Sequence, residues 1–396
     1  MKKVWDKWTR IALVKRILVG LILGAILGIA VPQATGIAIL GDVFVSALKA
    51  IAPLLVFFLV ISSLCNAGKS HGGVIKTVII LYMFSTVLAA VIAVFASMAF
   101  PVKMTLANAA TDTSAPQGIV EVLNNLLLNV VANPVSSLVN ANYVGILMWA
   151  VLLGLAFRAA DKMTKKVLAD VADGISMVVT WIINLAPFGI FGLVFNTVST
   201  NGLDIFTTYG KLLLLLVGCM LFIYFVTNPL LVYWCIRQNP YPLIFHCLKR
   251  SALTAFFTRS SAANIPVNMK VCEEMGLDRD TYSVTIPLGA TINMDGAAIT
   301  ITVMTMATAF TLGIHGDIPT AIILSLLAAL SACGASGVAG GSLLLIPMAC
   351  SLFGISDDIS MQVVAVGFII GVVQDSVETA LNSSSDLLLS ASAEFR

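Results

Sequence analysis

The sequence has few charged residues. Only 11% of its 396 residues are Asp, Glu, Lys or Arg, whereas about a quarter is usual in soluble domains. Apolar residues make up 59%, and the mean hydropathy is +1.00. Charge-free stretches long enough to cross about 30 Å of hydrocarbon recur along the chain, at residues 17–41, 77–102, 174–203 and 212–236. This composition excludes a soluble domain of useful size and predicts an all-α polytopic protein of the lipid bilayer.

Histidine and paired cysteine are also scarce. The three His residues are scattered, and the seven Cys residues are an odd number without a C-x-x-C pair. The sequence therefore favours neither a disulfide framework nor a His- or Cys-based metal centre, and it suggests no organic cofactor. The net charge of +2 gives no reason to expect a nucleic-acid partner.

Basic residues gather in alternate loops. They occur at residues 1–16, 66–76, 158–166 and 237–250, while residues 104–117 and 199–208 contain no Lys or Arg. Because cytoplasmic loops carry the excess of Lys and Arg, the N-terminus is predicted to lie in the cytoplasm. The first apolar run is too long for a signal-peptide core, so we interpret it as a retained span.

The apolar pattern changes along the chain. The first part predicts spans near residues 14–32, 44–66, 76–101, 119–157, 168–198 and 208–236. Residues 318–356 then form one charge-free stretch with "SACGASGVAGGS" in its middle, and residues 251–269 form a shorter apolar stretch around the polar tip "TRSSAA". Each predicts a re-entrant hairpin, because the apolar arms are too short to cross the membrane alone.

Each predicted hairpin precedes an apolar segment that carries a polar insert. The inserts are "NMDG" (residues 293–296) after the first hairpin and "DSVETALNSSSD" (residues 375–386) after the second. The two hairpin-plus-helix units would have opposite orientations in the membrane. Interrupted helices in an inverted repeat are typical of secondary transporters.

Four polar residues of the second insert would share one face of a helix. At 100° per residue, Asp375, Thr379, Asn382 and Asp386 fall within a stripe about 60° wide, with Glu378 at its edge. A charge at a helix centre costs about 2.5–3.5 kcal/mol on insertion scales, so these groups should face a partner, a cavity or an ion. The alternative is that the helix ends by Ser383 and the remainder is a solvated loop.

The first insert and the first hairpin tip suggest ligand groups. Asn and Gly around Asp295 favour unwound backbone, and free carbonyls beside a carboxylate suit a small hard cation. The alternative is an Asp that pairs with an Arg for packing. At the tip, Ser260 and Ser261 could receive an anionic group at a helix N-terminus, or form a plain turn. Arg259 could neutralise Glu378 or Asp375.

Four motifs, "FFTRSSAANIPVN", "IPLGATINMDGAA", "GASGVAGG" and "DSVETALNSSSD", resemble in order and spacing those of the glutamate-transporter-like family of sodium:dicarboxylate and amino-acid symporters. The resemblance covers nearly the whole chain and is strongest to the bacterial serine/threonine:sodium symporter branch. It implies eight transmembrane helices, two re-entrant hairpins, an elevator-type mechanism, a homotrimer, and sodium as coupling ion. It also implies a bacterial cytoplasmic (inner) membrane protein with both termini in the cytoplasm.

The family's domain division carries over to this numbering. Residues 1–72 and 119–206 would form the scaffold, as helices 1–2 and 4–5. Residues 73–118 would supply helix 3 and an external loop of the transport domain. Residues 207–396 would form its core, with helix 6, hairpin 1, helix 7, hairpin 2 and helix 8.

The resemblance also implies the ligand residues. Asp375 would bind the substrate ammonium, and Asn382 with Ser260 and Ser261 would bind its carboxylate. The tip with Ala335 and Gly337 would close as a gate, and Glu378 or Thr379 would meet the substrate side chain. Three sodium sites are implied: Asp386 with carbonyls of Gly289, Asn293 and Asn382; Thr291 with carbonyls of the second hairpin; and Asp295 and Asn293 with Tyr82, Ser85 and Thr86.

Two departures from the family's acidic-substrate members bear on the substrate. Those members carry an Arg at the position of Glu378 and a Thr at the position of Ala297. A second carboxylate would here be repelled instead of clamped, so the prediction is uptake of small neutral amino acids, serine and threonine. A sodium-coupled glutamate, aspartate or dicarboxylate symporter is the alternative, with Arg259 as the required cation. A passive channel is a further alternative. An intramembrane hydrolase would need a base near Ser260, and the sequence supplies none, so no enzyme is expected.

Overall fold

The computed structural model describes residues 11, 13–66, 73–106, 128, 131–140, 142–202, 204–314, 318–333 and 340–396. Throughout these ranges the regular structure is helical, without a strand. Six of the described helical segments are long and apolar enough to cross a membrane, namely Thr35–Ser62, Gly73–Ala99, Lys162–Asn184, Thr207–Ile236, Arg279–Thr311 and Asp357–Glu394. The composition-based prediction of a polytopic all-α membrane protein is therefore confirmed.

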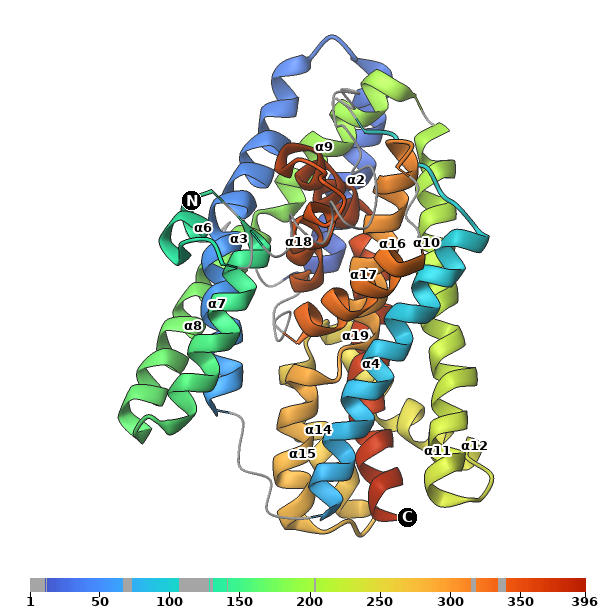
Figure 1. The fold of residues 1–396 in the computed structure, drawn as a ribbon. Helices are drawn as coiled ribbons and strands as arrows, with labels where there is room; N and C mark the ends of the chain where they lie inside the picture. The colour runs from blue at the N-terminus through green and yellow to red at the C-terminus, as the bar shows by residue number, and fades with distance from the viewer. Residues whose placement is uncertain are drawn as a thin grey trace.

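The N-terminal helices pack mainly on one another. Helix α3 (Ile39–Asn66) packs against α7 (Tyr143–Ala156), α8 (Lys162–Asn184) and α9 (Ala186–Asn201), while α2 (Leu13–Ala30) packs along α9. Figure 1 places α3, α7 and α8 side by side at its left, with the short α6 (Pro134–Val139) above α7. Because their contact surfaces are apolar and continuous, these helices form one block of the molecule.

A stripe of glycines brings α2 close to α9. Gly20, Gly24 and Gly28 recur every four residues, and a Cβ built on Gly24 would lie 2.6 Å from the carbonyl oxygen of Phe191. Small residues at this spacing let two membrane helices approach through their backbones. The stripe therefore fixes how α2 lies against α9.

A side chain at Gly24 should separate the two helices. We expect Gly24→Val to destabilise the protein by about 1–3 kcal/mol, the usual cost of overpacking, because the Cβ would meet backbone rather than a movable side chain. The thermal-unfolding midpoint of the detergent-solubilised protein measures this. Gly218→Val is the matched control, since a Cβ there would meet no atom of the described residues within 4 Å apart from those of its own turn of helix; equal midpoints for the two variants would contradict the prediction.

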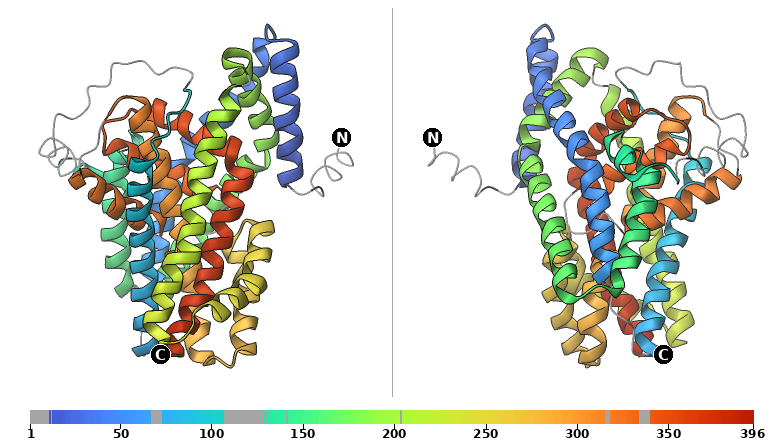
Figure 2. Two further views of the ribbon diagram at one scale, coloured as in Figure 1. Left: turned by 90° about the vertical axis from the view of Figure 1, so that its right-hand side faces the viewer. Right: turned by 60° about the vertical axis from the view of Figure 1, so that its left-hand side comes forward.

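The C-terminal helices surround one long central helix. Helix α19 (Asp357–Glu394) contacts α10 (Asp204–Phe222), α15 (Arg279–Ile292), α16 (Asp295–Thr311) and α4 (Gly73–Ala99). The left view of Figure 2 shows α19 in red beside the yellow-green α10. The position of α19 explains why its polar residues are buried on nearly every side.

Short helices occupy both predicted hairpins. The first contains α13 (Leu253–Thr258) and α14 (Ser261–Glu274); the second contains α17 (Ile318–Ala332), η5 (Gly341–Leu345) and α18 (Ile346–Ser351). In Figure 1, α14 lies in the lower half of the molecule, whereas α17 and α18 lie in the upper half. The two hairpins therefore approach the middle of α19 from opposite ends.

Three predicted spans differ in detail from the observed helices. The span at 168–198 is two helices, α8 and α9, with Leu185 between them; Pro187 lies in the first turn of α9, where its missing N–H costs nothing. The span at 119–157 contains the separate helices α6 and α7 in its described part. The span at 208–236 contains a π-helical turn, Ile223–Thr227, between α10 and α11 (Asn228–Ile236).

Candidate functional site

The polar insert of residues 375–386 lies inside a continuous helix. Helix α19 runs without interruption to Glu394, and Asp375, Glu378, Asn382 and Asp386 are all buried. The alternative that the helix ends by Ser383 is therefore wrong. Buried polar groups need partners, and most partners of these side chains lie on other elements of the chain.

The "NMDG" insert interrupts the helix pair α15 and α16, as predicted. Asn293 and Met294 have non-helical backbone angles between the two helices. Asp295, which is 0% exposed, begins α16, where the helix dipole favours a carboxylate. It accepts hydrogen bonds from the hydroxyls of Ser85 at 2.7 Å and Thr86 at 3.2 Å. These partners are side chains of α4, so the alternative of an Asp–Arg packing pair is wrong.

Asp386 lies beside the same interruption and has an oxygen without a partner. Its Oδ1 accepts from Nδ2 of Asn293 at 2.9 Å. Its Oδ2 and the Oδ1 of Asn293 are buried acceptors that receive no hydrogen bond from the described residues. Gly289 keeps the space beside this carboxylate open, because a Cβ there would lie 2.8 Å from Oδ1 of Asp386. Two unsatisfied hard oxygens at an unwound backbone can hold a small cation.

Tyr82 ties the surrounding helices together. Its hydroxyl lies 2.8 Å from the carbonyl oxygen of Asp386 and 2.7 Å from Oγ of Ser390. Its own carbonyl oxygen lies 2.9 Å from Oγ1 of Thr86, whose one hydroxyl proton is shared between this carbonyl and Asp295. The predicted trio is therefore divided between two partners: Ser85 and Thr86 contact the carboxylate of Asp295, whereas Tyr82 contacts the backbone carbonyl of Asp386.

Both hairpins reach the carboxylate of Asp375. Oδ2 accepts from Nε of Arg259 at 2.6 Å, and Oδ1 accepts from the backbone N–H of Gly340 at 3.1 Å. The exposed fractions are 8% for Arg259 and 3% for Asp375, so the ion pair is largely dry. Arg259 has a left-handed backbone, with φ of 53°, at the end of α13. Of the two carboxylates considered from sequence, Arg259 therefore pairs with Asp375.

The remaining predicted residues have local partners. Ser260 caps α14 by accepting from the N–H of Ala263 at 3.2 Å, and Ser261 is buried in the first turn of that helix. The Thr379 hydroxyl donates to the Asp375 carbonyl at 2.8 Å, and the Thr291 hydroxyl donates to the Leu288 carbonyl at 2.7 Å.

Asn382 joins α19 to α16. Its Oδ1 accepts from the backbone N–H of Gly296 at 2.7 Å, so its side chain holds the N-terminus of α16. Its carbonyl oxygen lies 3.4 Å from Nδ2 of Asn293. The predicted gate residues Ala335 and Gly337 lie outside the described residues.

Two further polar residues of the site were not predicted from the sequence. Asn264 and Asn268 of α14 bind Ser383, through Oγ at 2.8 Å and the carbonyl oxygen at 2.8 Å respectively. They recur four residues apart, so their helical spacing could have indicated a shared face. This network holds the first hairpin against α19.

Glu378 also has partners that the sequence did not identify. Its Oε2 accepts from Oγ1 of Thr300 at 2.7 Å, from Oγ of Ser342 at 2.9 Å and from Nε2 of Gln374 at 2.5 Å. Of these partners, only Gln374 could have been predicted from the sequence, because it lies four residues before Glu378 on the same helix. Thr300 and Ser342 are brought in by tertiary packing.

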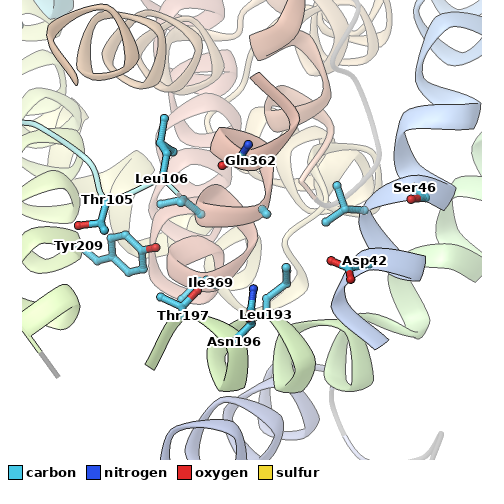
Figure 3. A pocket seen from close by; sticks show the side chains of 13 residues that line it. Asp42, Ser46, Thr105, Leu106, Leu193, Asn196, Thr197, Tyr209, Gln362 and Ile369 are labelled. Carbon is cyan, nitrogen blue, oxygen red and sulfur yellow. The ribbon is translucent and has the colours of Figure 1, made fainter. Parts of the chain in front are cut away.

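A separate cavity of about 250 Å³ opens between the two groups of helices (Figure 3). Its polar lining comes from α3, α9, α10 and α19 and from Thr105 after α4, with Asp42, Asn196, Tyr209 and Gln362 directed toward it. None of the predicted site residues that the structure describes lines it. The chemistry of the candidate site therefore lies in the packed core beside α19, away from this cavity.

Comparisons with known proteins identify relatives of this chain. A family model described as the sodium:dicarboxylate symporter family matches residues 13–394. A serine/threonine transporter SstT of Bifidobacterium adolescentis is 58% identical over 396 residues, which cover 100% of this chain and 92% of the relative. Serine/threonine transporters SstT from two strains of Streptococcus thermophilus are 55% and 56% identical over 395 residues, covering 100% of this chain and 98% of each relative.

Proposed function

The chain belongs to the sodium:dicarboxylate symporter family, and on this basis we propose that it is a sodium-coupled symporter that imports serine and threonine. The observation that carries the proposal is the buried pair of unpartnered oxygens, Oδ2 of Asp386 and Oδ1 of Asn293, at a helix interruption. Such a pair is costly unless a cation occupies it. Relatives named serine/threonine transporters support the substrate.

The coupling ion would use oxygens on both sides of the interruption. Sodium at Asp386 would satisfy the two unpartnered acceptors, with carbonyls of Gly289, Asn293 and Asn382 completing its shell. A second ion would sit at Asp295 with Ser85 and Thr86 of α4, and a third at Thr291. Sodium would order the backbone that Asn382 also holds. Serine affinity should therefore rise with sodium concentration, and sodium affinity should rise with serine by the same factor.

The substrate would lie between the hairpin tips and α19. Asp375 would bind its ammonium, and Ser260, Ser261 and Asn382 would bind its carboxylate. Arg259 already neutralises Asp375, so the ammonium would share that carboxylate with the guanidinium or displace it. Glu378 opposes the dicarboxylate alternative, because its carboxylate would repel a second substrate carboxylate.

The packing supports an elevator arrangement. We propose eight transmembrane helices and two re-entrant hairpins, with the block of α2, α3, α7, α8 and α9 as scaffold and the helices around α19 as transport domain. The domain limits proposed from sequence, 1–72 with 119–206 and 73–118 with 207–396, follow the same division. The assembly would be a homotrimer in the bacterial cytoplasmic membrane with both termini in the cytoplasm.

Uptake into proteoliposomes tests the function. We expect labelled serine to accumulate when an inward sodium gradient is applied and to remain at equilibrium when potassium or choline replaces sodium. Excess unlabelled threonine should block accumulation, while excess glutamate should leave it unchanged. Equilibration without a sodium gradient would indicate a passive channel, and block by glutamate alone would indicate the dicarboxylate alternative.

A further inference from the structure

An apolar groove lies between the end of α4 and the first half of α10. Its volume is about 830 Å³, within the range of about 300–1,000 Å³ for sites that hold small ligands. One wall comes from α4 and residues 100–102 after it, and the other comes from α10. Figure 1 shows the upper part of α4 beside α10. None of the described residues that we propose to bind sodium or serine lines this groove, so it is a separate site.

The lining combines small residues with large exposed apolar ones. Ala96 and Ala99 lie on the α4 side and Gly218 on the α10 side. A Cβ built on Gly218 would meet no atom of the described residues within 4 Å apart from those of its own turn of helix. Phe95 and Leu214, which also line the groove, are 57% and 75% exposed. The groove is therefore open to the outside of the molecule and apolar along its length.

The groove has the length of one leaflet of a bilayer. Its lining on α10 extends from Lys211 to Phe222, which corresponds to about 16 Å at 1.5 Å per residue. Half of the hydrocarbon core is about 15 Å thick. Lys211 lies about one helical turn inside the apolar span that begins at Thr207. The groove therefore runs from the level of the lipid headgroups to the middle of the membrane.

Lys211 is the one charged residue of the lining, and it lies at the headgroup end. Its side chain is exposed, and it forms no ion pair with a described residue. A Lys near a span end keeps its stem along apolar surface and its ammonium at the membrane boundary. Phosphate groups of lipids lie at this level, and a Lys there attracts anionic lipids.

We propose that this groove binds one acyl chain of an anionic phospholipid, whose headgroup lies at the ammonium of Lys211. The apolar lining suits the chain, and the lysine provides the complementary charge at the end where the headgroup would be. An apolar helix of a second copy of the chain would fit less well, because it would bury Lys211 without a counter-charge. The site does not depend on the proposed symport, since it lies apart from the residues that would carry it.

Native mass spectrometry of the detergent-purified protein tests the headgroup. Phosphatidylglycerol and phosphatidylcholine with the same acyl chains are added, and the dissociation constant of the first bound lipid is measured. We expect phosphatidylglycerol to bind about fivefold more tightly, as one Lys near the membrane surface would give. Lys211→Gln should remove this preference. Lys103→Gln is the matched control, because Lys103 is also exposed near the end of α4 but does not line the groove; it should keep the preference.

A side chain that fills the groove tests the acyl-chain position. Gly218→Trp should weaken both lipids about tenfold, because the indole would occupy the space of the chain. Gly210→Trp is the control on the same helix: a Cβ there likewise meets open space, but Gly210 does not line the groove. Phosphatidylglycerol should also raise the thermal-unfolding midpoint of the wild-type protein by linkage, and this rise should be lost in Gly218→Trp alone.

The other outcomes contradict the proposal in different ways. Equal affinity of the wild-type protein for the two lipids would exclude recognition of the anionic headgroup. Equal losses in Lys211→Gln and Lys103→Gln would assign the preference to general surface charge, and equal effects of the two Trp variants would place the lipid elsewhere. A wild-type protein that binds neither lipid, and whose oligomer dissociates in Gly218→Trp, would assign the groove to contact between two copies of the chain.

Discussion

Replacing Asp386 with Asn is expected to raise the sodium concentration needed for half-maximal serine uptake by roughly a hundredfold or more. The variant removes a unit charge next to the proposed ion, and such a charge at about 4 Å contributes about 4 kcal/mol at an effective dielectric constant near 20. Folding should survive, because the new amide keeps an oxygen that can still accept from Nδ2 of Asn293.

The sodium dependence of stability provides a second readout of this change. Sodium that binds only the folded protein raises the unfolding midpoint by linkage, and this rise should shift to much higher sodium in Asp386→Asn. Asp358→Asn is the matched control, since Asp358 lies in the first turn of the same helix, away from the site. An unaltered sodium dependence in Asp386→Asn would mean that this carboxylate does not bind the ion.

Replacing Asp375 with Asn is expected to abolish serine binding while sodium still raises the unfolding midpoint. The variant also leaves the Arg259 guanidinium buried beside a neutral group. Loss of one partner of a buried ion pair costs about 3–5 kcal/mol. The single variant should therefore be less stable as well as inactive.

A double-mutant cycle separates these two effects. Arg259→Gln combined with Asp375→Asn removes both charges, so stability should recover toward that of the wild-type protein while serine binding stays absent. Arg259→Gln alone should retain serine binding, because the freed carboxylate can still bind the ammonium. Normal serine uptake by Asp375→Asn would exclude the ammonium role, and recovery of uptake in the double variant would assign the defect to the unpaired Arg259.

The main elements of the site were predictable because each has a local physical cause. The polar stripe of α19 follows from helical spacing in an otherwise apolar segment. The interruption at Asn293 and Met294 follows from poor helix formers beside a charge. The limits of the helices were less predictable: the break at Leu185 and the π-helical turn at Ile223–Thr227 do not alter the apolar pattern from which spans are identified.

Composition and periodicity by themselves determined that this is a helical membrane protein and that Asp295, Asp375, Glu378 and Asp386 must face partners rather than lipid. The reason is that burying charge in hydrocarbon is costly wherever it occurs along a chain. Which partner each carboxylate has was decided only by the tertiary structure. Arg259 forms an ion pair with Asp375, and three donors form hydrogen bonds with Glu378. Oδ2 of Asp386 has no hydrogen-bond partner among the described residues. These contacts join residues far apart in the sequence, so no local pattern could specify them.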